Sequence, residues 1–330
     1  MALTLEEAKV GYADKVEQNV IDEFRRSSIL LDKLTFDDTI SPTGGSNLVY
    51  GYQRLETPST AAVRQINSEY SPNEAKRTKC TASPVILGGS FQIDRVIAQT
   101  SGAINEMDFQ IKEKTKAGAN YFHNLVINGT SASTGTGYVP NTFDGLKKIL
   151  SGKSTEMTTD IDISTSALLD SNYNALLDEL DTFIALLAAK PDVLMMNNKM
   201  LTKVKSAARR AGYYDRNKDD FGRTVETYNG IILMDAGQYY NGSTTEDVVS
   251  TSTPGSDTYG TTDIYAAKLG LDAFHGISVD GSKMLKTYLP DLQAPGAVKT
   301  GEVELIAGAV LKNSKMAGVL KGIKLLGKTA

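Results

Sequence analysis

The sequence predicts an α+β protein of about two domains. Its 330 residues exceed the ~100 to 200 that one domain usually needs. Residues 41–89 have no helical period and are interrupted by Pro and Gly, whereas residues 102–127 carry one long apolar stripe. Beyond residue 146, helical patterns alternate with short apolar strands. An extended stretch, an oversized helix and a mixed helix-and-strand unit therefore follow one another along the chain.

The composition excludes several classes of protein. The 35 Lys and Arg residues against 39 Asp and Glu give a net charge of −4, which excludes a strongly basic nucleic-acid binder. Hydrophobic residues at 41% and charged residues at 22% are typical of a folded chain. The strongest apolar run, Phe183–Ala189, is far shorter than the ~20 residues that cross a bilayer, so no membrane partner is expected. Cys80 is the only cysteine, which excludes an internal disulfide and a zinc site built on two cysteines.

The first residues predict an amphipathic helix rather than a signal peptide. Glu6 and Glu7 stand where an export signal needs basic and then apolar residues, so we expect synthesis in the cytoplasm. Apolar residues recur every three or four positions and line one face of this helix. That face either packs in the core or contacts another subunit. Its members that we take as candidate subunit contacts are Leu5, Tyr12, Val16 and Phe24.

Residues 41–89 predict a hairpin-like arm that reaches away from the body. Long irregular segments are uncommon in compact domains unless they have a function. A β-subdomain packed on the body is the alternative. Cations outnumber acids in this stretch, and we take five of them as further candidate subunit contacts: Arg54, Arg64, Lys76, Arg77 and Lys79.

The arm is followed by a strand and by the oversized helix. Phe91 and Ile93 alternate with polar residues, which predicts a half-buried strand. The apolar stripe then predicts a helix over 102–127, about 39 Å long at 1.5 Å per residue. Asn128-Gly129 ends it and opens a Gly, Ser and Thr-rich loop that runs to Pro140.

The second unit combines two helices with short strands. Apolar spacing predicts helices over 169–187 and 200–208, and strands at Val193–Met196 and Ile231–Met234. Half of residues 241–262 are Ser or Thr, which predicts a mobile surface loop.

The C-terminal part of the chain returns to strand. Alternation at 302–305, followed by an apolar run to Leu311, predicts a strand. The last twenty residues hold five Lys and no acid. These lysines either touch phosphates weakly or protect the edge of a sheet.

No residue set predicts catalysis, a cofactor or a metal. His123 and His275 each lack neighbouring ligands in the sequence. Gly322–Thr329 matches the P-loop pattern, but no room remains for the helix that must follow it. Asp215–Glu226 resembles a calcium loop with Asp220 where Gly is needed, and Arg209–Lys218 mixes cations and aromatics with acids. We therefore expect a protein that is not an enzyme, with a nucleotide-dependent cytoplasmic enzyme as a lesser alternative.

The order of these elements is similar to that in the major capsid proteins of tailed bacteriophages, which have the Hong Kong 97-like fold. The segments that carry the resemblance are Ala119–Gly129, Pro140–Leu146 and Gly301–Gly308. The likeness spans essentially the whole chain and implies five segments: an N-arm at 1–44, an extended E-loop at 45–93, a peripheral domain at 94–145 with its spine helix at about 102–127, an axial α/β domain at 146–270, and a return to the peripheral domain at 271–330.

The resemblance also implies a function and partners. It implies a structural subunit that forms hexamers and pentamers and assembles in the host cytoplasm into the icosahedral capsid of a virion. The shell would enclose double-stranded DNA through weak, non-specific contact. A separate scaffolding protein, a portal and decoration proteins are the other expected partners, and no cofactor is expected. Encapsulin compartments, which hold enzymes in place of DNA, share the fold and are the closest alternative.

Overall fold

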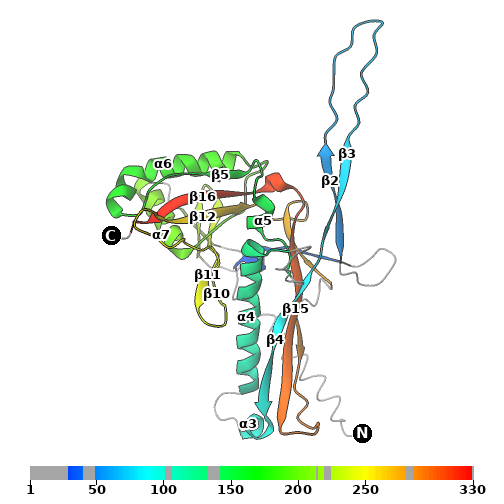
Figure 1. Cartoon of the computed structure of the whole chain (residues 1–330), viewed down its shortest axis with the longest axis vertical. Coiled ribbons are helices and arrows are strands. Elements are labelled where there is room, and N and C mark those ends of the chain that lie inside the picture. Colours follow the sequence, from blue (N-terminus) through cyan, green and yellow to red (C-terminus); the bar gives the residue numbers. More distant parts are fainter. Residues whose placement is uncertain are drawn as a thin grey trace.

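The computed structural model describes residues 29–39, 49–100, 106–131, 142–212, 215–218, 224–279 and 285–328. Figure 1 shows three parts: an upright body of one long helix beside long strands, a mixed domain at one side of its upper end, and a two-stranded hairpin that projects away from both. The helix predicted at the N-terminus, with Leu5, Tyr12, Val16 and Phe24, lies outside the described residues.

The sheet of the body is built around one 14-residue strand, β15 (Val298–Leu311). Strand β4 (Val85–Asp94) pairs along one edge of β15, from Asp94 opposite Val298 to Val85 opposite Ala307. The other edge pairs first with β14 (Leu285–Tyr288) and then with β13 (Phe274–Ser278). The short strand β1 (Phe36–Asp38) extends the sheet beyond β13.

The predicted long helix is α4 (Glu106–Asn128), which packs on β4 and β15. Its stripe is buried as the spacing predicts, with Ile111, Phe122 and Val126 fully covered. Thr115 is tolerated in this stripe because its hydroxyl donates to the carbonyl of Ile111 at 2.8 Å. Two short helices flank the body: α2 (Ile29–Lys33) and α3 (Arg95–Thr100).

Two glycines join the end of α4 to the next segment. A Cβ atom on Gly129 would lie 2.4 Å from the carbonyl oxygen of Phe143, and one on Gly145 would lie 2.6 Å from that of Leu125. The amide of Gly145 donates to the carbonyl of Gly129 at 2.8 Å. The backbones touch where only glycine fits, which explains Gly at both positions.

The mixed domain has a seven-stranded sheet in the order β5, β16, β12, β6, β9, β8, β7. Its helices α6 (Ser166–Ala185) and α7 (Asn198–Ala211) start at side-chain caps, Thr165 and Asn197. The short helix α5 (Leu146–Leu150) connects this domain to α4. The strands are β5 (Glu156–Thr158), β6 (Val193–Met196), β7 (Asp215–Lys218), β8 (Thr224–Tyr228), β9 (Ile231–Asp235), β12 (Gly260–Ala267) and β16 (Ala317–Leu326).

Strand β16 does not follow the expected return of residues 271–330 to the peripheral domain. The 3-10 turn η1 (Ser314–Met316) sends the chain from β15 into the mixed domain, where β16 lies between β5 and β12. Residues Val319, Leu320 and Ile323 are fully buried there, which favours this placement. The predicted protection of a sheet edge by C-terminal lysines is therefore wrong for β16, because both of its edges are paired.

Two predicted segments are held against the rest of the fold. Residues 29–39, within the expected N-arm, lie on the body, since Leu30, Leu31 and Leu34 are buried. The Ser/Thr-rich segment 241–262 is mostly exposed, as predicted, but contains β11 (Thr245–Asp247), which pairs with β10 (Gln238–Tyr240), and the buried Val248 and Val249. The amide of Asn197 donates to Thr262 Oγ1 at 2.8 Å, so hydroxyls hold this segment by hydrogen bonds.

Two glycines allow a matched test of these packing arguments. Gly145→Ala should lower the free energy of unfolding by about 1–3 kcal/mol, because its Cβ atom meets backbone that has no room to move. Gly118→Ala lies within α4 with nothing within 4 Å of the new Cβ atom, so it should raise stability by about 0.5–1 kcal/mol. Urea unfolding of unassembled subunits measures the change in stability for both variants, and equal effects of the two substitutions would contradict the predicted difference in packing.

Candidate subunit interface

The hairpin is formed by β2 (Tyr50–Thr57) and β3 (Lys76–Ala82), which pair only with each other. Pairing runs from Tyr50 opposite Ala82 to Thr57 opposite Lys76, and residues 58–75 connect the strands without joining either large sheet. The arm is shorter than the expected 45–93 segment, because β4 belongs to the body.

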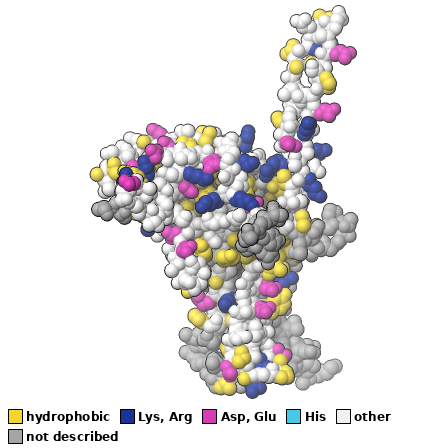
Figure 2. All heavy atoms as spheres, in the orientation of Figure 1, with side chains coloured by type: hydrophobic (Ala, Val, Ile, Leu, Met, Phe, Trp, Pro, Cys, Tyr) yellow, Lys and Arg dark blue, Asp and Glu magenta, His cyan; other side chains and the backbone are white. Residues whose placement is uncertain are grey.

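The far end of the hairpin exposes large apolar side chains. Val63 is 100% exposed, Ile66 91% and Tyr70 60%. Figure 2 shows hydrophobic side chains scattered along the projecting arm among charged ones. A solvated tip gains nothing from such residues, whereas an interface does. Our sequence reasoning selected the cations and missed Val63 and Ile66, although apolar residues inside an otherwise polar, Pro-containing stretch were the available signal.

Arg64 organises the tip. Its Nη1 donates to the carbonyl of Ser68 at 2.9 Å, and its guanidinium lies 5.7 Å from the centre of the Tyr70 ring. The hydroxyl of Ser68 in turn accepts from the amide of Gln65 at 3.0 Å. Arg64 therefore shapes the turn that presents Val63 and Ile66.

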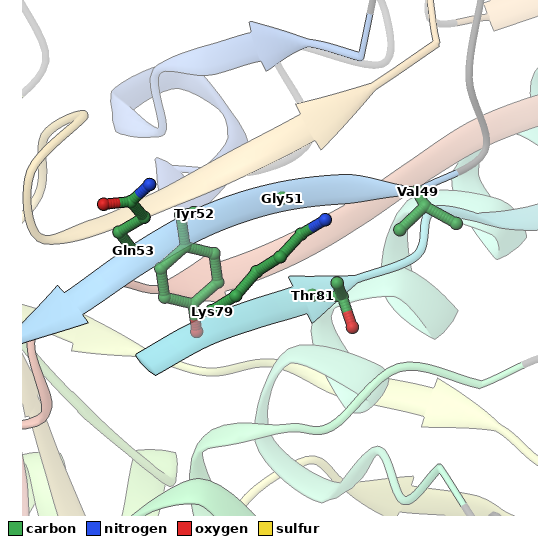
Figure 3. Close-up of a pocket in the computed structure, with 6 residues that line it drawn as sticks. All are labelled: Val49, Gly51, Tyr52, Gln53, Lys79 and Thr81. Atoms are coloured by element: carbon green, nitrogen blue, oxygen red, sulfur yellow. The ribbon is translucent and has the colours of Figure 1, made fainter. Parts of the chain in front are cut away.

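The cations of β3 give the arm a basic flank. Lys76, Arg77 and Lys79 are all exposed along this strand. Lys79 lies across Gly51 of β2, where a Cβ atom would be 3.6 Å from its Cε. Lys79 also lines a hollow of about 400 Å³ at the base of the arm, together with Val49, Gly51, Tyr52, Gln53 and Thr81. Figure 3 shows these six residues.

Arg54 holds the arm to the body of its own chain. Its Nε donates to the carbonyl of Lys312 and its Nη2 to that of Leu311, both at 2.9 Å. Paired donation by a guanidinium fixes direction as well as position. Both donors of Arg54 thus point at the end of β15, within the subunit.

A second contact fixes the first residue of β2. The hydroxyl of Tyr50 donates to Asp37 Oδ2 at 2.7 Å, and burial together with this bond raises the pKa of Tyr50. Its ring stands edge-on to His275 at 5.7 Å, and Lys312 Nζ lies 5.4 Å from the ring centre. The base of the arm is therefore attached to β1, β13 and the end of β15.

The remaining sequence motifs do not form sites in the described part of the chain. Burial lowers the pKa of His123 in α4 to about 4. Gly322 lies within β16, so the P-loop match falls in a strand. Asp215 and Glu226 belong to the paired strands β7 and β8, and so do not form a calcium loop. No group of three metal-ligating side chains occurs among the described residues, and none of the described helices is long and apolar enough to span a bilayer.

The cation and aromatic cluster after α7 is only partly described. Arg209 and Arg210 lie in the last turn of α7, where Arg210 Nε is 2.6 Å from Asp170 Oδ1. Tyr213 and Tyr214 lie outside the described residues. The cluster therefore gains no support as a single-strand binding site.

Residues 74–232, just under half of the chain, match the model of the SU10 major capsid protein family. No curated protein matches the sequence. Three solved structures resemble almost the whole chain: the holo-SrpI encapsulin complex of Synechococcus elongatus PCC 7942 (TM-score 0.61, 12% identity, 91% of this chain and 89% of that one), the capsid of a native GTA particle (0.58, 11%, 91% and 91%), and a chain of Mycobacterium phage Ogopogo (0.53, 13%, 89% and 91%).

The structural likeness establishes the fold, since identities of 11–13% carry no more than that. The predicted α+β architecture and the resemblance stated from the sequence are both confirmed. The family match adds the type of protein. The chain therefore has the Hong Kong 97-like fold, and its residues 74–232 are similar to the SU10 major capsid protein family.

Proposed function

We propose that this protein is a major capsid protein, which assembles with copies of itself, through hexamers and pentamers, into an icosahedral shell that encloses double-stranded DNA in a virion. The observation that carries the proposal is the projecting hairpin with a fully exposed Val63. A neighbouring copy that covers this tip removes apolar surface from water, and closed symmetry lets every copy make the same contact. Assembly in the host cytoplasm, with a separate scaffolding protein, a portal and decoration proteins, completes the proposal.

In this proposal, different parts of the arm make different kinds of contact with a neighbouring subunit. Val63 and Ile66 supply the apolar anchor at the tip, and Lys76, Arg77 and Lys79 supply charge that selects an acidic surface. Arg64 shapes the tip, and Arg54 sets the direction of the arm. The apolar N-terminal face of Leu5, Tyr12, Val16 and Phe24 is a second proposed contact, which rests on the sequence pattern alone.

A second candidate is an encapsulin-like compartment with a protein cargo. The specific observation in its favour is that the encapsulin chain has the highest TM-score of the three solved structures compared, 0.61. Sizing with light scattering and negative-stain microscopy tests assembly itself, and particles of tens of nanometres are expected. The ratio of absorbance at 260 nm to that at 280 nm, before and after opening the shells, then distinguishes DNA from protein cargo.

Removing the apolar anchor should block assembly without unfolding the subunit. The double variant Val63→Ser and Ile66→Ser should form few or no shells and keep the melting temperature of the parent, since both side chains are solvated in the isolated subunit. The matched control, Val63→Ile with Ile66→Val, keeps the apolar character and should assemble. Light scattering measures both, and normal shells from the serine variant would refute the role of the tip.

Releasing Arg54 should slow assembly. Arg54→Ala loses both bonds to the end of β15, so the arm must be ordered during each encounter, and we expect a rate reduced several-fold. Arg54→Lys keeps the charge but cannot make the paired contact, and should resemble Arg54→Ala. If Arg54 instead acted by charge on a neighbour, the Lys variant would assemble at the parental rate.

The N-terminal contact has its own test. Deletion of residues 1–27 stops before the buried Leu30 and should leave a soluble subunit that assembles poorly. Sizing chromatography and microscopy of this truncation are the measurements. Aggregation of the product would instead favour the alternative in which the predicted helix covers the core, and normal shells would remove the segment from the interface.

A further inference from the structure

The hinge between the hairpin and the body contains a histidine that the assembly contacts do not use. His275 of β13 is 0% exposed. Neither of its ring nitrogens makes a hydrogen bond of ordinary geometry among the described residues, and the backbone of Ala273 is the polar group that interacts with the ring. A buried imidazole with so little hydrogen bonding is costly, and a charged one there costs far more. The site therefore holds the ring in its neutral form.

The groups around His275 come from every element that meets at the hinge. Strand β1 contributes Asp37, β2 contributes Tyr50, and Lys312 follows the end of β15. Asp272 lies just before β13. Burial and Lys312 lower the pKa of His275, while Asp37, a hydrogen bond with the backbone of Ala273 and Asp272 act in the opposite direction, and the net shift is downward. The aromatic edge contact at 5.7 Å makes Tyr50 the neighbour that a charge on His275 would disturb directly.

Lys312 links this histidine to the attachment of the arm. Its ammonium lies over the face of Tyr50, 5.4 Å from the ring centre, while its backbone carbonyl accepts the bond from Arg54 Nε. A cation formed at His275 repels the ammonium of Lys312, which contacts the same Tyr50 ring and whose charge already lowers the pKa of His275. The disturbance therefore reaches both attachments of β2, at Tyr50 and at Arg54.

We propose that His275 is a proton-sensitive pin for the hairpin: neutral, it packs against Tyr50 and fixes the arm to the body, and protonated, it releases Tyr50 and loosens the arm. Proton binding needs no co-reactant beyond solvent. The consequence for shell formation, a change in arm direction as pH falls, rests on the proposed function. The pin itself belongs to the isolated subunit.

The direction of the pH effect follows from the pKa of His275 in the two states of the hinge. With the arm packed, the pKa of His275 lies below the ordinary value of about 6.5, and with Tyr50 withdrawn the ring meets water and its pKa returns toward that value. The packed state is therefore fully favoured above about pH 6.5. It loses stability as the pH falls below that value, until the packed form is itself protonated.

The composition of the chain allows a single tryptophan to be introduced as a fluorescent reporter of the movement of the arm. The chain has no tryptophan and two histidines. Val49 immediately precedes Tyr50, is 44% exposed and lines the hollow at the base of the arm in Figure 3, so Val49→Trp places one fluorophore at the hinge. Its emission is recorded on unassembled subunits from pH 8 to pH 5, with far-UV circular dichroism to detect unfolding of the body.

The expected result is a red shift of the emission below about pH 6.5, at constant circular dichroism. His275→Phe in the same background should abolish the shift, because an apolar ring of similar size keeps the contact with Tyr50 at every pH. His123→Phe is the control for the other histidine of the chain and should leave the shift unchanged. Where His275→Phe does not fold, His275→Gln serves as the neutral replacement.

Two results would overturn the proposal. One is a shift that persists in the His275 variants, and the other is constant emission over the whole range in which the body stays folded. Neither readout depends on shells, so a failure of assembly and a failure of the pin are distinguishable.

Discussion

The pairing of β15 on both edges is the constraint on which the rest of the molecule depends. Along one edge β4 pairs with residues Val298–Ala307, and along the other β14 and β13 follow in turn up to Leu311. A strand held this way cannot shift register without reversing which side chains face α4. Its C-terminal end is thereby fixed in space, and that end supplies the carbonyls of Leu311 and Lys312 to Arg54. The direction of a projecting arm is thus set by the longest strand of the body.

The same strand also connects the two domains. Residues 312–316, which include the 3-10 turn η1, join β15 to β16, and β16 lies second from the edge of the seven-stranded sheet. Helix α4 makes the second connection, through the glycine contact between Gly129 and Gly145. The chain also crosses from β12 to β13, and three covalent crossings, one of them closed by backbone contact that leaves no room for a Cβ atom, oppose hinge motion between the domains. We expect the hairpin, which joins neither large sheet and is held at its base by the side chains of Arg54 and Tyr50, to be the part that moves.

Local periodicity in the sequence was sufficient to predict the helices and strands, but not to predict which of them contact one another. The stripe of α4 and the run Val193–Met196 were identified correctly because burial of one face or of a whole strand leaves its period in the sequence. Arg54 could not be assigned, because a cation in an extended stretch has the same local signature whether its acceptor belongs to its own chain or to another. The position of β16 is equally invisible, since strand order is decided by contacts distant in sequence. His275 was identified in the sequence as an isolated histidine, but only the fold shows that it is buried against the ring of Tyr50.

The charges of the subunit favour a shell that holds its cargo by enclosing it rather than by binding it. The basic C-terminal run suggested contact with phosphates, yet Lys321 forms an ion pair with Glu156, and Lys324 lies 3.0 Å from Asp160. These lysines are matched by acids of the same domain, which weakens any pull on a polyanion. A chain with net charge −4 also has no net attraction for a polyanion. In the proposed shell Lys76, Arg77 and Lys79 of the arm are engaged by neighbouring copies, so assembly removes this basic flank from competition for DNA. Exposed cations of the mixed domain such as Lys147 and Lys199 then supply only weak, non-specific contact.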